Sequence, residues 1–459
     1  LQGVDLGLAL MTEQLSDEQV AAGANARQFS SLKAQAEQIA FVGIDGITAS
    51  GTDLQIEINQ GQAGVGAAPD SVVDFSGQQL AVAAGAAGAS VSLDSDGALG
   101  ELVRASGQVD MGVFGFASLS GFFSFESASR SLVLSDNSTV MADALLVGGS
   151  NIDAFVGVNG GTDDAVGLSL SGAEFGLALL ASQADPSRSW TTLQATASSL
   201  AFEGIEGMTA RGTDIALAIN QASRVGDAVV DYRVGKTDLL IATSRETSLR
   251  LDLSGAEGEV IKASTQLELD LFGFFSVEGG FALEQRSQSV TLSDGSEIES
   301  AQLVTIGASE VQAFAGIGAG GDTPVGLSLG DVNFGLALIS DPDHPERNFV
   351  TLQATAASAA VQGIDGLTLR VQDLLVNVNR GITLAAEAEQ TEQTNTRLGL
   401  SIPLGFLGTL VFGDGSDTAE VAVSADLTNA ELLLALTAAM GSLASVGAGN
   451  VRVTGNRDD

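Results

Sequence analysis

The chain contains the heptapeptide AEFGLAL at residues 173–179, and two further copies of this pattern decide the fold. They are VDLGLAL at 4–10 and VNFGLAL at 332–338. A second block follows each copy, as FVGIDGIT (41–48), FEGIEGMT (202–209) and VQGIDGLT (361–368). The copies lie about 160 residues apart. This period is too long for a single solenoid coil, so each repeat is a domain-sized unit or a block of several coils.

The rest of the unit occurs twice. The paired blocks are VFGF (113–116) and LFGF (271–274), LVLSD (132–136) and VTLSD (290–294), and AFVG (154–157) and AFAG (313–316). The third copy departs from the pattern after about Gly381. We therefore predict repeat unit 1 at 1–170, unit 2 at 171–330, the first part of unit 3 at 331–381, and a divergent β module, a candidate cap, at 382–459. Because the first copy begins inside the pattern, we expect a fragment of a longer protein.

Apolar residues alternate with small or polar residues within each unit. In IALAIN (215–220) the Ile and Leu residues fall on one face and the Ala and Asn residues on the other, and 265–284 alternates similarly. A period of two residues is typical of strands, and SDGS (293–296) is typical of a turn. The small residues on the second face favour close stacking. We predict an all-β fold with very little helix, an elongated array built either as a β-solenoid or as stacked antiparallel β-sheets.

The secondary structure of three segments does not follow from this alternation alone. Residues 16–24 are rich in Glu, Gln and Ala, and we predict a short helical insertion there. Residues 29–42 align with a Thr-rich segment of the second copy, which favours strand over helix. Residues 429–440 have no repeat partner, so helix and strand stay open, with Asn429 as a candidate helix cap.

Composition excludes several classes of function. The 459 residues carry a net charge of −38 and no Cys. A polyanion repels nucleic acid and an anionic membrane surface. No apolar run of about 20 residues is present to span a bilayer. The absence of Cys excludes disulfides and thiolate sites but not an extracellular location, because large repetitive domains do not need disulfides. The charge favours counter-cations, with Ca²⁺ the obvious candidate.

Candidate reactive residues are few. The single histidine, His344, lies in a loop that has no His in the aligned copies, so a catalytic or ligand role is disfavoured. Trp190 aligns with Phe349 and is predicted to be core. The densest carboxylate groups are the Ca²⁺ candidates, in which a Gly-permitted turn supplies several oxygens; they are Asp163, Asp164, Asp414 and Asp417. Asp53, Asp214 and Asp373 recur in register beside a Gly-Thr pair, which indicates a structural turn or cap, and Asn59, Asn220 and Asn379 follow them.

The FGLAL, GI(D/E)G and FGF blocks together resemble the repeat regions of giant, acidic, Cys-free surface or secreted proteins of Gram-negative bacteria. Such adhesins and matrix fibres are often exported by type I secretion. The resemblance implies a location outside the cell or at its surface, and partners that are copies of the chain or neighbouring repeats. It supplies no catalytic residues.

Three hypotheses remain open from the sequence. The first is a structural module of a filament, matrix fibre or adhesin, acting as a self-associating rod or spacer. The second is a ligand-binding module that recognises a glycan, ice or a host surface through a repetitive β face. The third is an all-β glycosidase that works through two carboxylates. It is disfavoured because most carboxylates recur with the fold, so the prediction is that the chain is not an enzyme.

Overall fold

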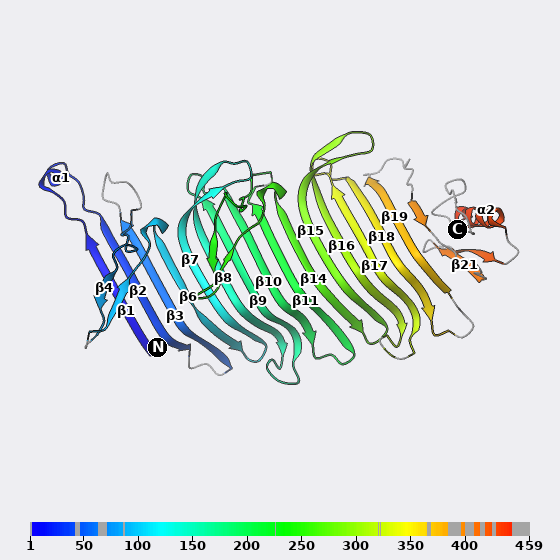
Figure 1. Ribbon diagram of the computed structural model, residues 1–459, viewed down its shortest axis with the longest axis horizontal. Coiled ribbons are helices and arrows are strands. Elements are labelled where there is room, and N and C mark those ends of the chain that lie inside the picture. The colour runs from blue at the N-terminus through cyan, green and yellow to red at the C-terminus, as the bar shows by residue number, and fades with distance from the viewer. Residues whose placement is uncertain are drawn as a thin grey trace.

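One antiparallel sheet of 16 strands dominates the computed structural model (Figure 1). The structure describes residues 2–41, 46–62, 71–85, 88–224, 226–319, 321, 323–364, 369–383, 396–399, 408–413, 418–424 and 428–442. The strands lie side by side in chain order, so the sheet is a meander interrupted only by insertions. The all-β prediction is confirmed. Of the two architectures left open, the antiparallel sheet is correct and the β-solenoid is wrong, because each strand pairs with its neighbour through a hairpin.

Each complete repeat unit contributes six strands to this sheet. Unit 1 supplies β1 (Gln2–Thr12), β2 (Gln28–Phe41), β3 (Ile47–Gln62), β6 (Leu102–Val113), β7 (Ala117–Val133) and β8 (Thr139–Val158). Unit 2 supplies β9 (Val166–Ser182), β10 (Ser189–Glu203), β11 (Met208–Ala222), β14 (Val260–Leu271), β15 (Phe275–Thr291) and β16 (Glu297–Ile317). Unit 3 supplies β17 (Val325–Ser340), β18 (Arg347–Gln362) and β19 (Leu369–Thr383), and the segment predicted as a divergent module adds β20 (Thr396–Gly399) to the same sheet.

The sheet continues through both junctions between units. Leu145 of β8 pairs with Leu179 of β9, and the equivalent Val304 of β16 pairs with Leu338 of β17 in the same register. The predicted unit boundaries at 170/171 and 330/331 lie inside β9 and β17, respectively. The repeats therefore share one sheet and one hydrogen-bond ladder.

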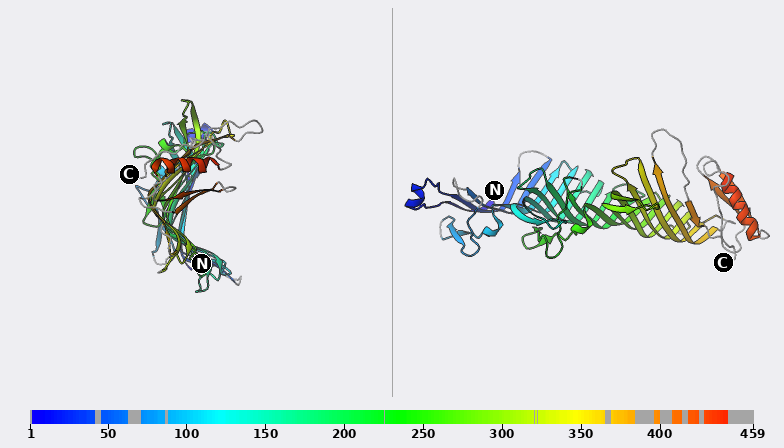
Figure 2. Two further views of the ribbon diagram at one scale, coloured as in Figure 1. Left: turned by 90° about the vertical axis from the view of Figure 1, so that its right-hand side faces the viewer. Right: turned by 90° about the horizontal axis from the view of Figure 1, so that it is seen from above.

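The alternating sequence gives the sheet two distinct faces, and two insertions cover parts of only one of them. The first insertion, lobe 1, spans the described residues 71–85 and 88–101 and contains β4 (Leu80–Ala83), β5 (Ser90–Leu93) and the 3₁₀ turn η1 (Gly97–Leu99). The second, lobe 2, spans 226–259 and contains β12 (Leu240–Ala242), β13 (Ser248–Arg250) and η2 (Gly255–Glu257). Both project from the same side of the sheet (Figure 2). We call that side the lobed face and the other side the open face.

The main hydrophobic core lies between lobe 2 and the lobed face. It joins Val230, Tyr232, Leu239, Ile241, Leu251 and Leu253 of the lobe to Leu132, Leu134, Ala142, Ala144, Leu146, Ala178, Leu180 and Trp190 of the sheet and its adjoining loop. Trp190 is only 1% exposed, which confirms that it is a core residue. A single sheet cannot enclose a core by itself, and the lobe supplies the second layer.

The recurring aspartates are bulge residues. Asp53 and Asp214 adopt φ of 55° and 50°, and the register shifts beside each of them, where β3 pairs with β6 and β11 pairs with β14. Asp373 has a φ of 53° at the equivalent place in β19. Asp tolerates this left-handed conformation better than most residues. The prediction of a structural role is confirmed, although the feature is a bulge within a strand rather than a turn or cap.

The helices are few, as predicted. The helix α1 (Asp17–Ala21) is the expected insertion between β1 and β2, and Ser16 caps it in a capping box with Gln19. The expected strand at 29–42 is β2, although Val42 lies outside the described residues. The helix α2 (Asn429–Ser442) resolves the open segment at 429–440 as helix and packs on the hairpin of β21 (Gly408–Gly413) and β22 (Thr418–Val423). Its cap is Thr428 rather than Asn429, because the Thr428 hydroxyl accepts from the Glu431 N–H and the Glu431 carboxylate accepts from the Thr428 N–H.

The alternating segment 265–284 is not one strand. It is a hairpin in which β14 ends at Leu271 and β15 begins at Phe275. Phe272 and Gly273 both have positive φ in the turn, at 55° and 68°. Because paired residues across a hairpin share a face, the alternation continues on both sides of the turn, and periodicity alone does not reveal the reversal.

Candidate functional site

Three equivalent sites lie on the lobed face, one in each unit, and we call each of them a floor. Floor 1 consists of Phe29, Ser31, Lys33 and Asn59; floor 2 of Trp190, Thr192, Gln194 and Asn220; and floor 3 of Phe349, Thr351, Gln353 and Asn379. In each unit the first three residues come from the second strand and the Asn from the third. Strand pairing places the middle residue opposite the Asn, so that all four side chains share one face.

Floor 2 holds lobe 2 through a chain of buried hydrogen bonds. The Asn220 amide donates to the Val230 carbonyl oxygen over 2.8 Å. Thr192 donates to the Asn220 Oδ1 over 3.2 Å and accepts from the Tyr232 hydroxyl over 2.8 Å. Both floor residues are 0% exposed. Buried polar groups that are fully paired define one docked geometry, because any displacement leaves a donor or acceptor without a partner.

Two further contacts fasten the rim of lobe 2. The Gln194 amide donates to the Asp252 carboxylate over 2.6 Å, and its Oε1 accepts from the Asp252 N–H over 2.8 Å. The Trp190 Nε1 donates to the Ala228 carbonyl over 2.9 Å. Floor 2 therefore forms hydrogen bonds with both the backbone and one carboxylate of lobe 2, which covers it.

Floor 1 holds lobe 1 with the same geometry. Asn59 donates to the Val73 carbonyl over 2.8 Å, and Lys33 forms a 2.6 Å ion pair with Asp94, in the place of the Gln194–Asp252 contact. Phe75 replaces the tyrosine of lobe 2 and has no hydroxyl. Accordingly, the buried Ser31 Oγ and Asn59 Oδ1 have no hydrogen-bond partner among the described residues.

Floor 3 has the same residues but is exposed. Thr351 donates to the Asn379 Oδ1 over 3.1 Å, which reproduces the Thr192–Asn220 bond. Yet Thr351, Gln353 and Asn379 are exposed, whereas Ser31, Thr192, Asn59 and Asn220 are completely buried. Among the described residues, none outside the sheet forms a hydrogen bond with these three side chains.

Each lobe is also organised by one aspartate. The Asp231 carboxylate accepts hydrogen bonds from the Gly255 N–H at 3.1 Å and from the Arg233 N–H and guanidinium. It thereby ties the first segment of lobe 2 to η2. Asp74 accepts from the Ser76 and Gly97 N–H groups in the same way in lobe 1. The Arg233 side chain, helped by these N–H groups, lowers the pKa of Asp231 to about 2.

Lobe 2 is therefore expected to open more easily in acid. The folded-state pKa of Asp231 lies below its unfolded value, so this carboxylate stabilises the lobe above about pH 4, and the contribution is lost as the pH falls toward 2. The shift corresponds to about 2 kcal/mol. The measurement is denaturant titration followed by the fluorescence of Trp190, the only tryptophan of the chain.

The control for this prediction is Asp231→Asn, because the other carboxylates of the chain also titrate in acid. The free-energy difference between wild type and variant should be largest near pH 6 and should shrink toward pH 2. A difference that is constant across this range would show that the Asp231 charge does not hold the lobe.

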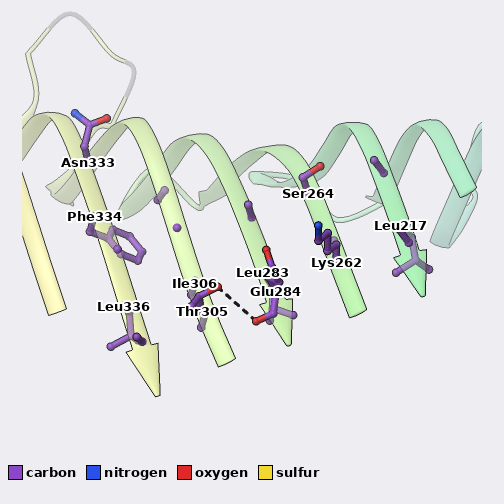
Figure 3. Close-up of a pocket in the computed structure, with 18 of the residues that line it drawn as sticks. Leu217, Lys262, Ser264, Leu283, Glu284, Thr305, Ile306, Asn333, Phe334 and Leu336 are labelled. Carbon is purple, nitrogen blue, oxygen red and sulfur yellow. Dashed lines mark hydrogen bonds between the residues drawn. The ribbon is translucent and has the colours of Figure 1, made fainter. Parts of the chain in front are cut away.

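A trough of about 1030 Å³ runs from lobe 2 toward floor 3 on the lobed face. Leu249 of lobe 2 borders one end, and Thr351 and Gln353 border the other. Figure 3 shows Lys262, Glu284 and Thr305 on consecutive strands along it. Lys262 forms a 2.6 Å ion pair with Glu257, and the Thr305 hydroxyl donates to the Glu284 backbone oxygen at 3.5 Å. Gly307 and Gly335 also line the trough, and the absence of their side chains leaves space above the sheet there.

The open face carries large apolar side chains along the whole sheet. Exposed members on β1, β3, β6, β7, β8, β9, β15 and β17 are Val4, Leu6, Leu8, Leu10, Ile56, Val103, Phe125, Leu145, Leu179, Leu283 and Leu338, with exposures between 39% and 74%. Exposed apolar side chains in this number on one face are typical of an interaction surface.

Of the four predicted metal candidates, the structure describes only Asp163 and Asp164, and these two join no cluster of possible metal ligands. Asp163 and Asp164 are exposed in the turn between β8 and β9, where Thr162 donates to the Asn159 carbonyl and accepts from the Asp164 N–H. Asp414 and Asp417 lie outside the described residues. Within the described part of the chain, no group of three or more His, Asp or Glu residues could hold a metal ion. Calcium binding at these four residues stays a prediction.

His344 lies in the loop between β17 and β18 and forms a 3.3 Å pair with Glu346. Sequence reasoning noticed the recurring Asn residues but missed the lobes that they hold. A signal was present: VVDF (72–75) and VVDY (229–232) are the two segments that cross floors 1 and 2. Each contains the valine whose carbonyl accepts from the floor Asn and the organising aspartate.

Comparisons with known proteins add little. No family model matches the chain, and no curated protein matches it. Among solved structures, it is similar to the alcaligin outer membrane receptor FauA from Bordetella pertussis, with 8% identity over 92% of this chain and 66% of that chain, and a TM-score of 0.19. It is also similar to the siderophore receptor PirA from Pseudomonas aeruginosa, with 9% identity over 82% and 76% of the two chains and a TM-score of 0.14. Likeness at this level carries no argument about function.

None of the helices in the described residues is both long enough and apolar enough to cross a bilayer.

Proposed function

We propose that this chain is a structural repeat module of an extracellular filament, matrix fibre or large adhesin of a bacterial surface. It acts as a self-associating rod or spacer and carries out no catalysis. The observation that carries the proposal is the unbroken sheet across both repeat junctions. Val147 pairs with Leu177 at the first junction, and the equivalent Ile306 pairs with Leu336 at the second. Units joined by this ladder extend a rod by six strands each, or about 29 Å at the usual strand spacing.

The edge strand β1 supports self-association. It has the same sequence pattern as β9 and β17, which pair on their outer sides with β8 and β16. Among the described strands, β1 pairs only with β2, and its outer edge is the place where a strand of the β8 type, from a preceding repeat or from another copy of the chain, would continue the ladder. Leu8 and Leu10 are 46% and 74% exposed there. A long apolar edge of this kind is a template for pairing with another chain.

Electron microscopy of the purified chain tests the proposal. At about 0.15 M salt, which screens the net charge of −38 beyond roughly 8 Å, linear particles are expected. The double variant Leu8→Lys/Leu10→Lys places charge on the edge and should reduce the particles to single-chain length. Val234→Lys/Leu434→Lys makes the same change at exposed positions of lobe 2 and α2, away from the β1 edge, and should leave the particles long.

Two results would contradict this picture. Compact globules without linear order in the wild type would exclude the rod. Long particles in the Leu8→Lys/Leu10→Lys variant would show that growth does not use the β1 edge.

A further inference from the structure

We propose that floor 3 is a docking site for a lobe-type segment supplied by another chain of this repeat class. The segment is an extended Val-Val-Asp-aromatic peptide followed by a hairpin, like lobes 1 and 2. The inference deepens the proposed self-association and rests on it. It differs from edge pairing because it uses the lobed face.

Floor 3 retains the residues that bind a lobe in floors 1 and 2. Asn379 corresponds to the two asparagines that donate to a lobe carbonyl, and Gln353 corresponds to Gln194, which binds the lobe carboxylate of Asp252. The apolar support is also present, because Ile339 and Phe349 stand where Leu180 and Trp190 support lobe 2. In floor 3 these apolar side chains are only half-buried.

Two glycines of the sheet lie directly beneath lobe 2, and both have equivalents in the next unit. A Cβ at Gly148 would overlap the Ala242 carbonyl of lobe 2, and a Cβ at Gly176 would lie 3.1–3.2 Å from Leu249 and Ile241 of that lobe. Glycine is needed at both positions because the lobe backbone and side chains approach the sheet closely. The equivalent residues of the next unit are Gly307 and Gly335. A Cβ at Gly307 would meet its nearest neighbour at 3.9 Å, and one at Gly335 would meet nothing within 4 Å.

The connection that follows the floor is much shorter in unit 3 than in units 1 and 2. The insertion between β3 and β6 spans residues 63–101, and that between β11 and β14 spans 223–259. The connection between β19 and β20 is residues 384–395 only. A 12-residue connection cannot supply the 30 or so residues that form each lobe. Within the described part of the chain, unit 3 therefore has a lobe acceptor and no lobe in the equivalent position.

The occupant follows from what the other floors bind. Floor 2 binds a backbone carbonyl through the Asn amide, a buried Tyr hydroxyl through the Thr, and the Asp252 carboxylate through the Gln, and all three partners come from one lobe. The first two belong to the VVDY segment, whereas Asp252 follows the β12–β13 hairpin. Floor 3 offers the same three floor residues in the same register. A lobe that carries the VVD-aromatic segment and an aspartate in the place of Asp252 satisfies all of them at once. A generic apolar peptide would leave the Gln unpaired under cover, which is unfavourable.

The test is the binding of a fluorescent synthetic peptide of residues 226–259 to the full chain, measured by anisotropy. Saturable binding of one peptide per chain is expected. Asn379→Ala and Gln353→Ala should each weaken it about tenfold, as expected for one lost hydrogen bond under cover. Gly307→Val should abolish it by blocking the path of the peptide. The matched control Gln372→Ala changes an exposed glutamine of β19 outside floor 3 and should have no effect.

Three outcomes would overturn the inference. They are no binding, binding that the floor-3 variants leave unchanged, and binding that shifts the Trp190 emission, since the last would show displacement of lobe 2 from floor 2. Edge-grown rods would still be visible by microscopy if floor 3 bound nothing, so the failure of this inference is distinguishable from failure of the proposed function.

Discussion

Replacing Trp190 with alanine is expected to lower the free energy of opening lobe 2 by about 3–5 kcal/mol. The indole is 1% exposed and lies in the largest core cluster of the described residues. Its removal leaves a cavity between lobe and sheet, which the surrounding strands can fill only in part because their hydrogen-bond ladders hold them. It also removes the donor to the Ala228 carbonyl. Hydrogen exchange of the lobe 2 amides measures this free energy.

The matched control is Phe349→Ala at the equivalent position of floor 3. Phe349 is only half-buried and no described lobe covers it, so its truncation should cost clearly less. Equal losses in the two variants would mean that Trp190 contributes through the sheet alone, and that burial under the lobe adds nothing.

Replacing Gly148 with valine is expected to eject lobe 2 from the sheet. The added Cβ would overlap the Ala242 carbonyl oxygen, which also accepts a hydrogen bond from the Ser124 hydroxyl. Backbone cannot yield as the end of a flexible side chain can, so β12 must move away. Overpacking of this kind costs typically about 1–3 kcal/mol and more where backbone must shift. The emission of Trp190 should shift to longer wavelength as water reaches the indole.

Gly307→Val is the control, because this glycine occupies the same place in the next unit. Its nearest atom would be 3.9 Å from the new Cβ, so the substitution should leave folding and the Trp190 emission unchanged. Valine also suits a strand better than glycine does. An unshifted emission in Gly148→Val would contradict the placement of β12 over the sheet.

Much of the fold could be predicted from the sequence because its cause is local. Alternation of apolar and small residues identifies each strand separately. Because the sequence repeats, a strand predicted in one unit also predicts a strand in the equivalent segment of the others. This is why 29–42 was correctly interpreted as strand despite its helix-forming composition. The same local logic failed at 265–284, where a turn at Phe272-Gly273 preserves the alternation. It also could not choose between solenoid and meander, because both are built from such strands.

The candidate sites were harder to predict. The recurring Asn59, Asn220 and Asn379 were visible in the sequence, but their role depends on carbonyls 10 to 14 residues away in segments without regular period. β12 and β13 are only three residues long, too short for an alternating pattern to emerge. Carboxylate density drew attention to Asp163 and Asp164, which the structure places in an exposed turn. The number of acidic residues in a short stretch is a poor guide to a metal site when their carboxylates do not converge on one point.

The sequence by itself determined the repeat, most of the strands, the two faces of each strand and the structural role of the recurring aspartates, whose place at bulges only the structure showed. Each of these depends on backbone preferences and side-chain order within a few residues. Only the tertiary structure decided which face is covered and where. Thr192 and Asn220 are completely buried and Thr351 and Asn379 are exposed, although they have the same identities and the same pairing. The difference arises because burial depends on a second layer, and the chain supplies that layer from insertions long enough to fold back in units 1 and 2 but not in unit 3.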